Sequence, residues 1–387
     1  MLDINKWERD FMIENLKGLL SFRGRNNFTN MSRYLRYNEA TIRSWYEKYF
    51  NYLFFNIELI KTLKDELRII AFDPSYVSKS GQLTPGLGYF WSGCDNSTKR
   101  GLEITGIASV GLESKTAMHL EAHQTFKSED ESFNLLTFYA NLILSNVELY
   151  KQVSDSVVVD AYFSRFTFVD PLVEKGFIII SKLAKNAFLR YRNTEPPTGK
   201  RGRPKVYGEK VKFNNLDQRH FTLCFKNENS EAFEAEVHSK SLKRWIKCVV
   251  VVTELDNGKT RREILFSTDI NQSGSAIIER YRLRFQIEFL FRDAKQFTGL
   301  THCQARSKNK IHNHINMSLT AVSVAKALHY FDNKTEEKEP FSLSSIKMLY
   351  FNRNYIQRIF KGFGIAPEPY DNSEQMLQIE RFGCIAA

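Results

Sequence analysis

The chain has 387 residues, of which 42% are hydrophobic and 26% charged, and its formal net charge is +11. This length and apolar content predict a folded protein of two or three domains and exclude a disordered chain. The excess of Lys and Arg indicates a polyanionic partner, with nucleic acid first and an acidic membrane second. Five widely spaced cysteines without a C-x-x-C pair exclude a zinc knuckle and a disulfide framework, and favour reduced thiols in a cytosolic setting.

The first 65 residues predict helices. Charges throughout the first twenty residues exclude a signal peptide, and no stretch of the chain is long and apolar enough to span a bilayer. Residues 28–36 and 41–50 predict two short helices with a break at Asn38, a pattern that resembles a helix-turn-helix. Arg43 and Lys48 on the second helix would then contact DNA. A helical cap or a dimer element is the alternative, because any helical hairpin with surface arginines has this pattern.

Residues 66–185 predict strands and helices in the order strand, strand, strand, helix, strand, helix, strand. The predicted strands cover 67–73, 102–111, 115–126, 157–159 and 176–183, and the predicted helices cover 129–149 and 165–175. Asp73 ends the first strand, and a loop-like segment follows it. Asp160 directly follows the strand at 157–159. The same pattern, an apolar strand and then an aspartate, therefore occurs twice, and polar sites collect at such strand ends.

Residues 186–270 predict a β-rich insertion with a basic arm. The arm contains KRGRPK, which resembles a minor-groove hook, in which arginines flank a Gly-Arg-Pro core and enter a narrow A·T-rich groove. A solvated, flexible loop is the alternative interpretation. The cations of this segment are Lys200, Arg201, Arg203 and Lys205.

Residues 275–300 predict one amphipathic helix. At about 100° per residue, Tyr281, Arg284, Glu288 and Lys295 project within roughly 60° of one another, and the opposite side is apolar. Arg292 falls on the same stripe. A carboxylate in this setting can bind a divalent metal ion while the cations around it hold phosphate. A salt-bridged surface helix is the alternative.

Three acids stand out: Asp73, Asp160 and Glu288. Two carboxylates at neighbouring strand ends and a third from a packed helix can hold two Mg²⁺ ions, and such hard oxygen ligands suit Mg²⁺ or Mn²⁺ rather than zinc. Two such ions can activate a water or a 3′-hydroxyl and stabilise the leaving oxygen in an in-line displacement at phosphorus. The residues alone thus predict a basic protein with a plausible carboxylate site.

The spacing of Tyr281, Arg284, Glu288 and Lys295 resembles the Y-x2-R-x3-E-x6-K signature of DDE transposases of the insertion-sequence 4 family. The segments AFDPSYVSKSG and VVVDAYFSR are similar to the first and second aspartate regions of that family, and the resemblance extends over residues 67–300. It implies a ribonuclease-H-like catalytic core, whose strand order agrees with the predicted one. It also implies a β-rich insertion ahead of the glutamate helix.

By this resemblance, Asp73, Asp160 and Glu288 would be the metal-binding catalytic triad for two Mg²⁺ or Mn²⁺ ions. Tyr281, Arg284 and the lysine of the signature would grip the phosphates of the transposon end. The implied activity is cut-and-paste DNA transposition: metal-dependent cleavage at the insertion-element ends, followed by joining of the 3′-hydroxyl ends to target DNA. The alternatives are a metal-dependent nuclease on the same core and a non-catalytic, domesticated DNA-binding protein.

The implied partners are double-stranded DNA, as terminal inverted repeats and as target, and a second copy of the chain in a homodimer on DNA. No membrane partner is expected, and the expected location is the bacterial cytoplasm, at the nucleoid when DNA is bound. We therefore expect an α/β fold with a ribonuclease-H-like core, a β-rich insertion and helical flanking regions. The expected parts are a helical DNA-binding region (1–65), the first part of the core (66–185), the insertion (186–270), the core catalytic helix (271–305) and a helical C-terminal region (306–387).

Overall fold

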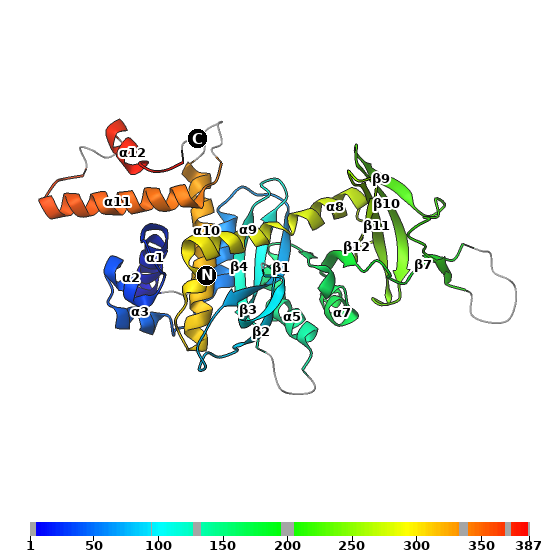
Figure 1. Cartoon of the computed structure of the whole chain (residues 1–387), viewed down its shortest axis with the longest axis horizontal. Helices are drawn as coiled ribbons and strands as arrows, with labels where there is room; N and C mark the ends of the chain where they lie inside the picture. Colours follow the sequence, from blue (N-terminus) through cyan, green and yellow to red (C-terminus); the bar gives the residue numbers. More distant parts are fainter. Residues whose placement is uncertain are drawn as a thin grey trace.

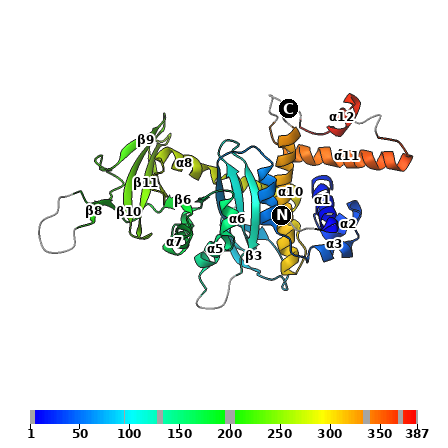
Figure 2. The ribbon, with the colours of Figure 1, turned by 180° about the vertical axis from the view of Figure 1, so that it is seen from behind.

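The computed structural model describes residues 5–93, 95–126, 133–194, 205–332, 340–367 and 373–385. The molecule is elongated, with a mixed sheet in the middle and a second group of strands at one end (Figure 1). Helices from the two ends of the chain lie together at the other end, which is also visible from behind (Figure 2). Segments that are far apart in the sequence are therefore neighbours in the fold.

The N-terminal helices are each started by an asparagine. They are α1 (Lys6–Ser21), α2 (Phe28–Tyr34), α3 (Glu39–Trp45) and α4 (Tyr52–Lys61). In each case the side chain of the preceding asparagine accepts a hydrogen bond from a backbone N–H of the first turn. The predicted break at Asn38 is confirmed, because its Oδ1 accepts from the N–H of Thr41 at 2.8 Å. The local sequence thus specifies where these helices begin.

The central sheet combines antiparallel and parallel strands. Its strands are β1 (Arg68–Ser78), β2 (Gly88–Ser92), β3 (Ser97–Gly111), β4 (Ala117–Gln124), β5 (Ser156–Val158) and β6 (Ile178–Leu183). Along the sheet the order is β4-β3-β1-β5-β6, and β2 pairs with the first part of β3. The pairs among β1 to β4 are antiparallel, whereas β1–β5 and β5–β6 are parallel.

Three sequence-based expectations about this part of the chain were wrong. β1 does not end at Asp73 but continues to Ser78, because β3 is long enough to pair with all of it. The segment after Asp73 is not all loop, since β2 lies within it. The single helix expected over 129–149 is, within the described residues, two helices, α5 (Leu135–Leu144) and α6 (Val147–Lys151).

Both faces of the sheet are buried. Ile69 and Ala71 of β1 belong to a core on one face, and the alternating Ile70 and Phe72 belong to a second core on the other face. The second core includes α5 and α7 (Phe166–Glu174), and the ring of Phe72 lies 5.2 Å from that of Phe163. Period-two alternation in β1 thus fixes which side chains point toward the first face, and Asp73 is one of them.

The strands of the insertion continue the central sheet. They are β7 (Leu189–Arg192), β8 (Tyr207–Lys210), β9 (Thr222–Lys226), β10 (Ser230–Ser239), β11 (Arg244–Glu254) and β12 (Thr260–Ser267). β12 pairs antiparallel with β6, so the strand order runs on as β6-β12-β11-β10-β7-β8. The insertion is joined to the core by backbone hydrogen bonds and not only by connecting loops.

The helix expected over 275–300 is interrupted. The segment forms α8 (Gly274–Leu283), α9 (Gln286–Asp293), a π-helical turn (Ala294–Thr298) and a 3₁₀ turn (Leu300–His302). Between α8 and α9 the backbone tightens, because the N–H groups of Phe285 and Glu288 each bond the carbonyl three residues before them. Both junction residues, Arg284 and Phe285, keep right-handed helical dihedral angles. The side chains of one stripe therefore still point in similar directions.

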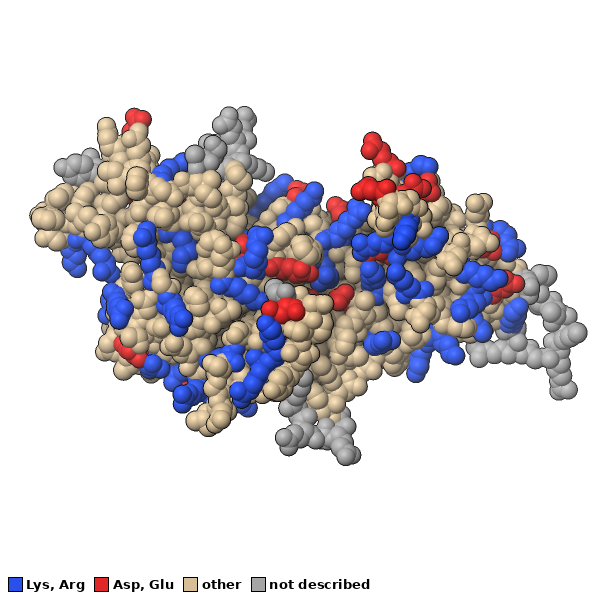
Figure 3. Space-filling model, viewed as in Figure 1, with Lys and Arg blue, Asp and Glu red and all other residues tan. Residues whose placement is uncertain are grey.

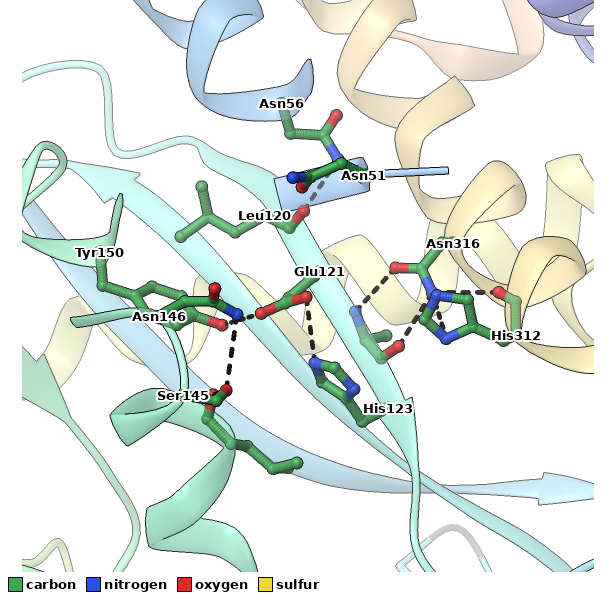
Figure 4. Close-up of polar contacts among 12 residues, drawn as sticks. Asn51, Asn56, Leu120, Glu121, His123, Ser145, Asn146, Tyr150, His312 and Asn316 are labelled. Atoms are coloured by element: carbon green, nitrogen blue, oxygen red, sulfur yellow. Dashed lines mark hydrogen bonds and ion pairs between the residues drawn. The ribbon is translucent and has the colours of Figure 1, made fainter. Parts of the chain in front are cut away.

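The C-terminal helices are α10 (Lys308–Asp332), α11 (Leu343–Phe363) and α12 (Glu374–Glu380). α10 covers the free edge of β4. Its Asn316 side chain accepts from the N–H of Ala122 at 2.8 Å and donates to the carbonyl of the same residue at 2.9 Å, as a paired strand would (Figure 4). Ser323 and Lys326 bond two further backbone groups of β4. An edge that could pair with another chain is thus closed by side chains.

The histidines of this region have structural partners. His119 Nε2 lies 3.0 Å from Asn316 Oδ1. His123 Nε2 lies 3.1 Å from Glu121 Oε2, beside Tyr150 (Figure 4). Burial lowers the pKa of His119 to about 4, so this imidazole is neutral at physiological pH. These contacts join β4 to α6 and α10. No helix of the described residues is long and apolar enough to cross a membrane.

Candidate active site

The parallel pairing of β1 and β5 brings Asp73 and Asp160 to the same level of the sheet. The last pair in this register is Ala71 with Val158, and each aspartate lies two residues beyond it. Asp160 then accepts a hydrogen bond from the N–H of Ala161 at 2.7 Å, which starts a short 3₁₀ turn. The negative charge of Asp160 contributes to raising the pKa of Asp73, so the two carboxylates lie within electrostatic range of each other.

Helix α9 supplies the third acid by packing closely on β3. Gly106 of β3 lies opposite Asp73, and a Cβ atom on this glycine would lie 2.5 Å from Cζ of Phe291. The missing side chain therefore lets α9 approach the sheet. Glu288 lies one turn before Phe291 on the same helix. Sequence reasoning did not identify Gly106, because its role depends on a contact between distant parts of the chain.

Arg284 joins two of the three acids. Its Nη1 lies 3.2 Å from Oδ1 of Asp73, and its Nη2 lies 3.2 Å from Oε1 of Glu288. The side chain of Arg284 is 15% exposed, against 20% for Asp73 and 39% for Glu288. The guanidinium thus lies between a strand carboxylate and a helix carboxylate, in a half-buried position where charge pairs are stronger than at the surface.

The carboxyl group of Asp73 carries a strongly shifted pKa. Burial is the largest cause, and with the charges of Glu288 and Asp160 it raises the pKa of Asp73 to about 7, although Arg284 and Lys295 act in the opposite direction. Carboxylates that share a site disfavour each other's ionised form. The protein's own cations therefore compensate the negative charge of this site only in part.

The donor set of the site fits a hard divalent cation, but its arrangement is not that of a preformed metal centre. Within the described residues, no group of three or more His, Cys, Asp or Glu side chains is positioned to hold a metal ion. Asp73, Asp160 and Glu288 offer carboxylate oxygens, the ligands that Mg²⁺ and Mn²⁺ prefer. Arg284 would have to leave Asp73 and Glu288 before these oxygens could coordinate an ion.

Tyr281 and Lys295 flank the acids. Burial, with smaller contributions from Asp160 and Glu263, raises the pKa of Tyr281 to about 12, so its hydroxyl stays protonated and can donate a hydrogen bond. Lys295 Nζ donates to Oγ of Ser75 at 3.0 Å, two residues beyond Asp73 on the same face of β1. Of the predicted stripe, Arg284 and Lys295 therefore contact β1 directly, whereas Tyr281 lies within electrostatic range of Asp160.

The fifth residue of the predicted stripe lies in a different environment. The guanidinium of Arg292 lies 3.3 Å from Asp293 and 4.7 Å from the centre of the Phe289 ring, and most of its side chain is exposed. Asp293 itself is buried, and its charge acts on the half-buried Lys326 of α10. The charge of Asp293 thus acts toward the C-terminal helices and not toward the other acids.

The other cations predicted to bind DNA lie far from the acids. Arg43 pairs with Glu39 at 2.5 Å, and Lys48 lies 3.6 Å from the centre of the Trp45 ring. Lys205 is exposed and directly precedes β8 of the insertion, which lies at the end of the molecule opposite α2 and α3 (Figure 2). Lys and Arg side chains cover parts of both ends in Figure 3. The remaining cations of the basic arm, Lys200, Arg201 and Arg203, lie outside the described residues.

A mixed sheet that gathers three carboxylates beside an arginine, a lysine and a tyrosine defines a candidate phosphoryl-transfer site. The family described as "Transposase DDE domain" matches residues 120–324, which is more than half of the chain. The chain therefore belongs to this family and is a DDE transposase, a class of DNA-cleaving enzymes that use divalent metal ions. The match includes Asp160 and Glu288, whereas Asp73 lies upstream of it. No curated protein matches the chain.

Proposed function

We propose that the protein is a cut-and-paste DNA transposase of the insertion-sequence 4 family. It would cleave the ends of its own element and join the 3′-hydroxyl ends to target DNA. The observation that carries this proposal is the gathering of Asp73, Asp160 and Glu288 from two strands and a helix around Arg284. The helical spacing of Tyr281, Arg284, Glu288 and Lys295, with Arg284 and Lys295 in contact with β1, supports the assignment of the family signature to these residues.

The sheet supports the assignment of a ribonuclease-H-like core to residues 66–185 together with the helices of 271–305. Its order is β4-β3-β1-β5-β6, with antiparallel strands on one side of β1 and parallel strands on the other. This order brings the first acid to the central strand and the second to its parallel neighbour. Residues 186–270 would then be the insertion between the last core strand and the glutamate helix.

Asp73, Asp160 and Glu288 would hold two Mg²⁺ or Mn²⁺ ions. When bound, such ions supply an activated water or 3′-hydroxyl and stabilise the leaving oxygen. Arg284 would exchange its two carboxylate partners for a DNA phosphate, to which a guanidinium binds through two N–H groups. Lys295 and the protonated Tyr281 would hold neighbouring phosphates of the transposon end. The chain's own residues thus position the DNA, and the acids hold the ions.

The rest of the chain would bind DNA and a second copy. We assign duplex contacts to Arg43 and Lys48 of the N-terminal helices and to the basic arm that ends at Lys205, because a backbone-binding surface needs many cations. The C-terminal helices would form the homodimer contact, since Tyr355 and Phe363 of α11 lie exposed eight residues apart on one side of that helix. The expected location is the bacterial cytoplasm, at the nucleoid when DNA is bound.

A supercoiled plasmid that carries the gene with its flanking genomic sequence tests the function, because it contains the element ends whatever their sequence is. With Mg²⁺, the protein is expected to release the element and to yield joined products. Glu288→Gln is expected to bind the plasmid and to produce neither. Glu279→Gln is the matched control, since this exposed residue of α8 undergoes the same change of charge. Normal cleavage by Glu288→Gln would overturn the proposal, and cut ends without joined products would identify a nuclease.

A further inference from the structure

The hairpin formed by β2 and β3 carries two exposed aromatic side chains. Tyr89 is 66% exposed and Trp91 is 59% exposed, whereas Phe90 between them is 4% exposed. Residues two apart on a strand point to the same face, so both rings leave the sheet on one side and Phe90 anchors the strand from the other. The two large exposed rings on a strand anchored by Phe90 form a candidate binding surface.

The pairing register assigns this surface to the face that carries Asp73. On β3, Gly106 pairs with Asp73, and Arg100 pairs with Tyr89. Partner residues in an antiparallel pair share a face, and so do residues separated by an even number along one strand. Gly106 and Arg100 are six positions apart on β3, so they share a face. Tyr89, the partner of Arg100, therefore lies on the catalytic face, at about 20 Å from Asp73 along the strand direction.

Asp95 links the two strands of the hairpin next to the turn. Ser92 Oγ donates to Oδ2 of Asp95 at 2.7 Å, and Lys99 Nζ lies 2.7 Å from Oδ1 of the same residue. Lys99 belongs to the opposite face, so it is not part of the aromatic surface. Rings on such a fixed strand lose little conformational entropy when they bind a partner, which favours binding.

Arg100 lies beside the two rings, and further cations lie at the same end of the sheet. Arg100 is exposed directly beside Tyr89. Lys79, one residue after β1, donates to the carbonyl of Ala305 at 3.0 Å and so ties the exposed Arg306 to this end of the sheet. Lys308 lies 4.7 Å from the centre of the Phe126 ring, next to the loop that precedes β2. The surroundings of the rings therefore favour a polyanion over an apolar protein partner.

We propose that Tyr89 and Trp91 stack on unpaired bases of the DNA strand that runs from the carboxylates across the catalytic face. This inference rests on the proposed function, because it takes the site of cleavage to be at Asp73, Asp160 and Glu288. Duplex DNA presents phosphates to a flat protein surface, whereas unpaired bases present ring faces that stack on aromatic side chains. The hairpin is thus a second DNA-binding surface, specific for single-stranded or locally opened DNA.

Binding to a fluorescein-labelled oligo(dT) of about 20 nucleotides, longer than a typical single-strand site, tests this proposal by fluorescence anisotropy without metal. Replacing both Tyr89 and Trp91 by Ala is expected to weaken this binding by about tenfold or more, and binding of a duplex of equal length by less than about twofold. Trp7→Ala removes an exposed tryptophan on α1 and is the control for general surface effects. An unchanged affinity for oligo(dT), or an equal loss on the duplex, would overturn the proposal.

Two single variants separate stacking from apolar contact. Trp91→Phe keeps an aromatic face and is expected to stay within about threefold of the wild-type affinity, whereas Trp91→Leu is expected to resemble the alanine variant. Equal affinities of the two variants would contradict stacking. A fall in sedimenting mass without a change in DNA affinity would identify the hairpin as a contact between copies and would also overturn the proposal.

This experiment and the test of the function can fail independently. Binding of oligo(dT) is measured without metal and requires no cleavage, so Glu288→Gln is expected to bind it as the wild type does. If Glu288→Gln cleaves normally, the proposed function is overturned, but the result of the oligo(dT) binding experiment is not affected. If Glu288→Gln loses cleavage but the Tyr89 and Trp91 variants bind oligo(dT) as the wild type does, only the proposal about the aromatic surface is overturned.

Discussion

The guanidinium of Arg284 lies 3.2 Å from the carboxylate of Asp73, although 211 positions separate the two residues in the chain. The same guanidinium reaches Glu288 one helical turn later. One guanidinium therefore pairs with two of the three acids. A metal ion and the arginine compete for the same oxygens, so binding of one is linked to displacement of the other.

Replacing Arg284 by Gln is expected to tighten Mn²⁺ binding to the DNA-free protein by about tenfold, since a unit charge a few ångströms away contributes on the order of 1–4 kcal/mol. Calorimetric titration with Mn²⁺ measures this change. Cleavage is expected to fall at the same time, because the phosphate loses its guanidinium. Arg282→Gln, an exposed neighbour on α8, is the control. Equal Mn²⁺ affinities of wild type and Arg284→Gln would show that the arginine does not compete with the ion.

The raised pKa of Asp73 predicts a pH-dependent stability. Its pKa is about 7 in the folded protein against an ordinary value of 3.8 for this side chain, so the folded state binds this proton more tightly than the unfolded state. The stabilisation is complete below about pH 4 and is lost as the pH rises through about 7. Asp73→Asn removes this loss, so above pH 7 it is expected to be more stable than the wild type by about 1–2 kcal/mol, allowing for partial exposure of the carboxyl group.

Urea unfolding in EDTA at a series of pH values measures this difference. Asp170→Asn is a suitable control, because Asp170 pairs with Arg244 in a different part of the molecule. If Asp73→Asn has the pH profile of the wild type, then the carboxyl group is not desolvated in the folded state.

Gly106 is expected to tolerate no side chain while α9 stays in place. Gly106→Ala puts a methyl group against Phe291, which is itself buried, and is expected to cost about 1–3 kcal/mol of stability and to lower cleavage by moving Glu288. Thermal unfolding and plasmid cleavage measure the two effects. The double variant Gly106→Ala with Phe291→Leu is expected to recover part of both. Gly93→Ala is the control, because a Cβ there meets no atom within 4 Å.

Asn316 is expected to be among the most sensitive positions of α10. Asn316→Leu leaves the N–H and the carbonyl of Ala122 buried without their partner, at a cost of about 1–3 kcal/mol for each group. Ser323→Ala removes one bond to β4 and is expected to cost less. Thermal unfolding gives the two values. A larger loss of stability for Ser323→Ala than for Asn316→Leu would contradict the role of the Asn316 amide in closing the edge of β4.

Much of the candidate site was predictable because it depends on local periodicity. Tyr281, Arg284, Glu288 and Lys295 follow helical spacing, and the tightened turn between α8 and α9 does not rotate them apart. Asp160 was predictable because it lies two residues after a short apolar strand. These features depend on residues that are close together in the chain, so a single sequence is enough to predict them.

The rest depends on partners that are distant in the chain. Asp73 was expected at a strand end, but the length of β1 is set by its partner β3, which no local pattern reveals. The ion pair between Arg284 and Asp73 and the close packing at Gly106 are likewise long-range contacts. β2 was missed because its five residues lie among Gly, Pro and Ser, where turn signals dominate.

β12 of the insertion pairs with β6 of the core. Because the insertion shares a hydrogen-bonded sheet with the core, its position relative to the carboxylates is fixed by the number of strands between them. Base pairs held by the insertion would thus meet the cleavage site at a constant offset. On the proposed function, the width of the sheet, and not a flexible tether, would set the distance between DNA held by the insertion and the site of cleavage.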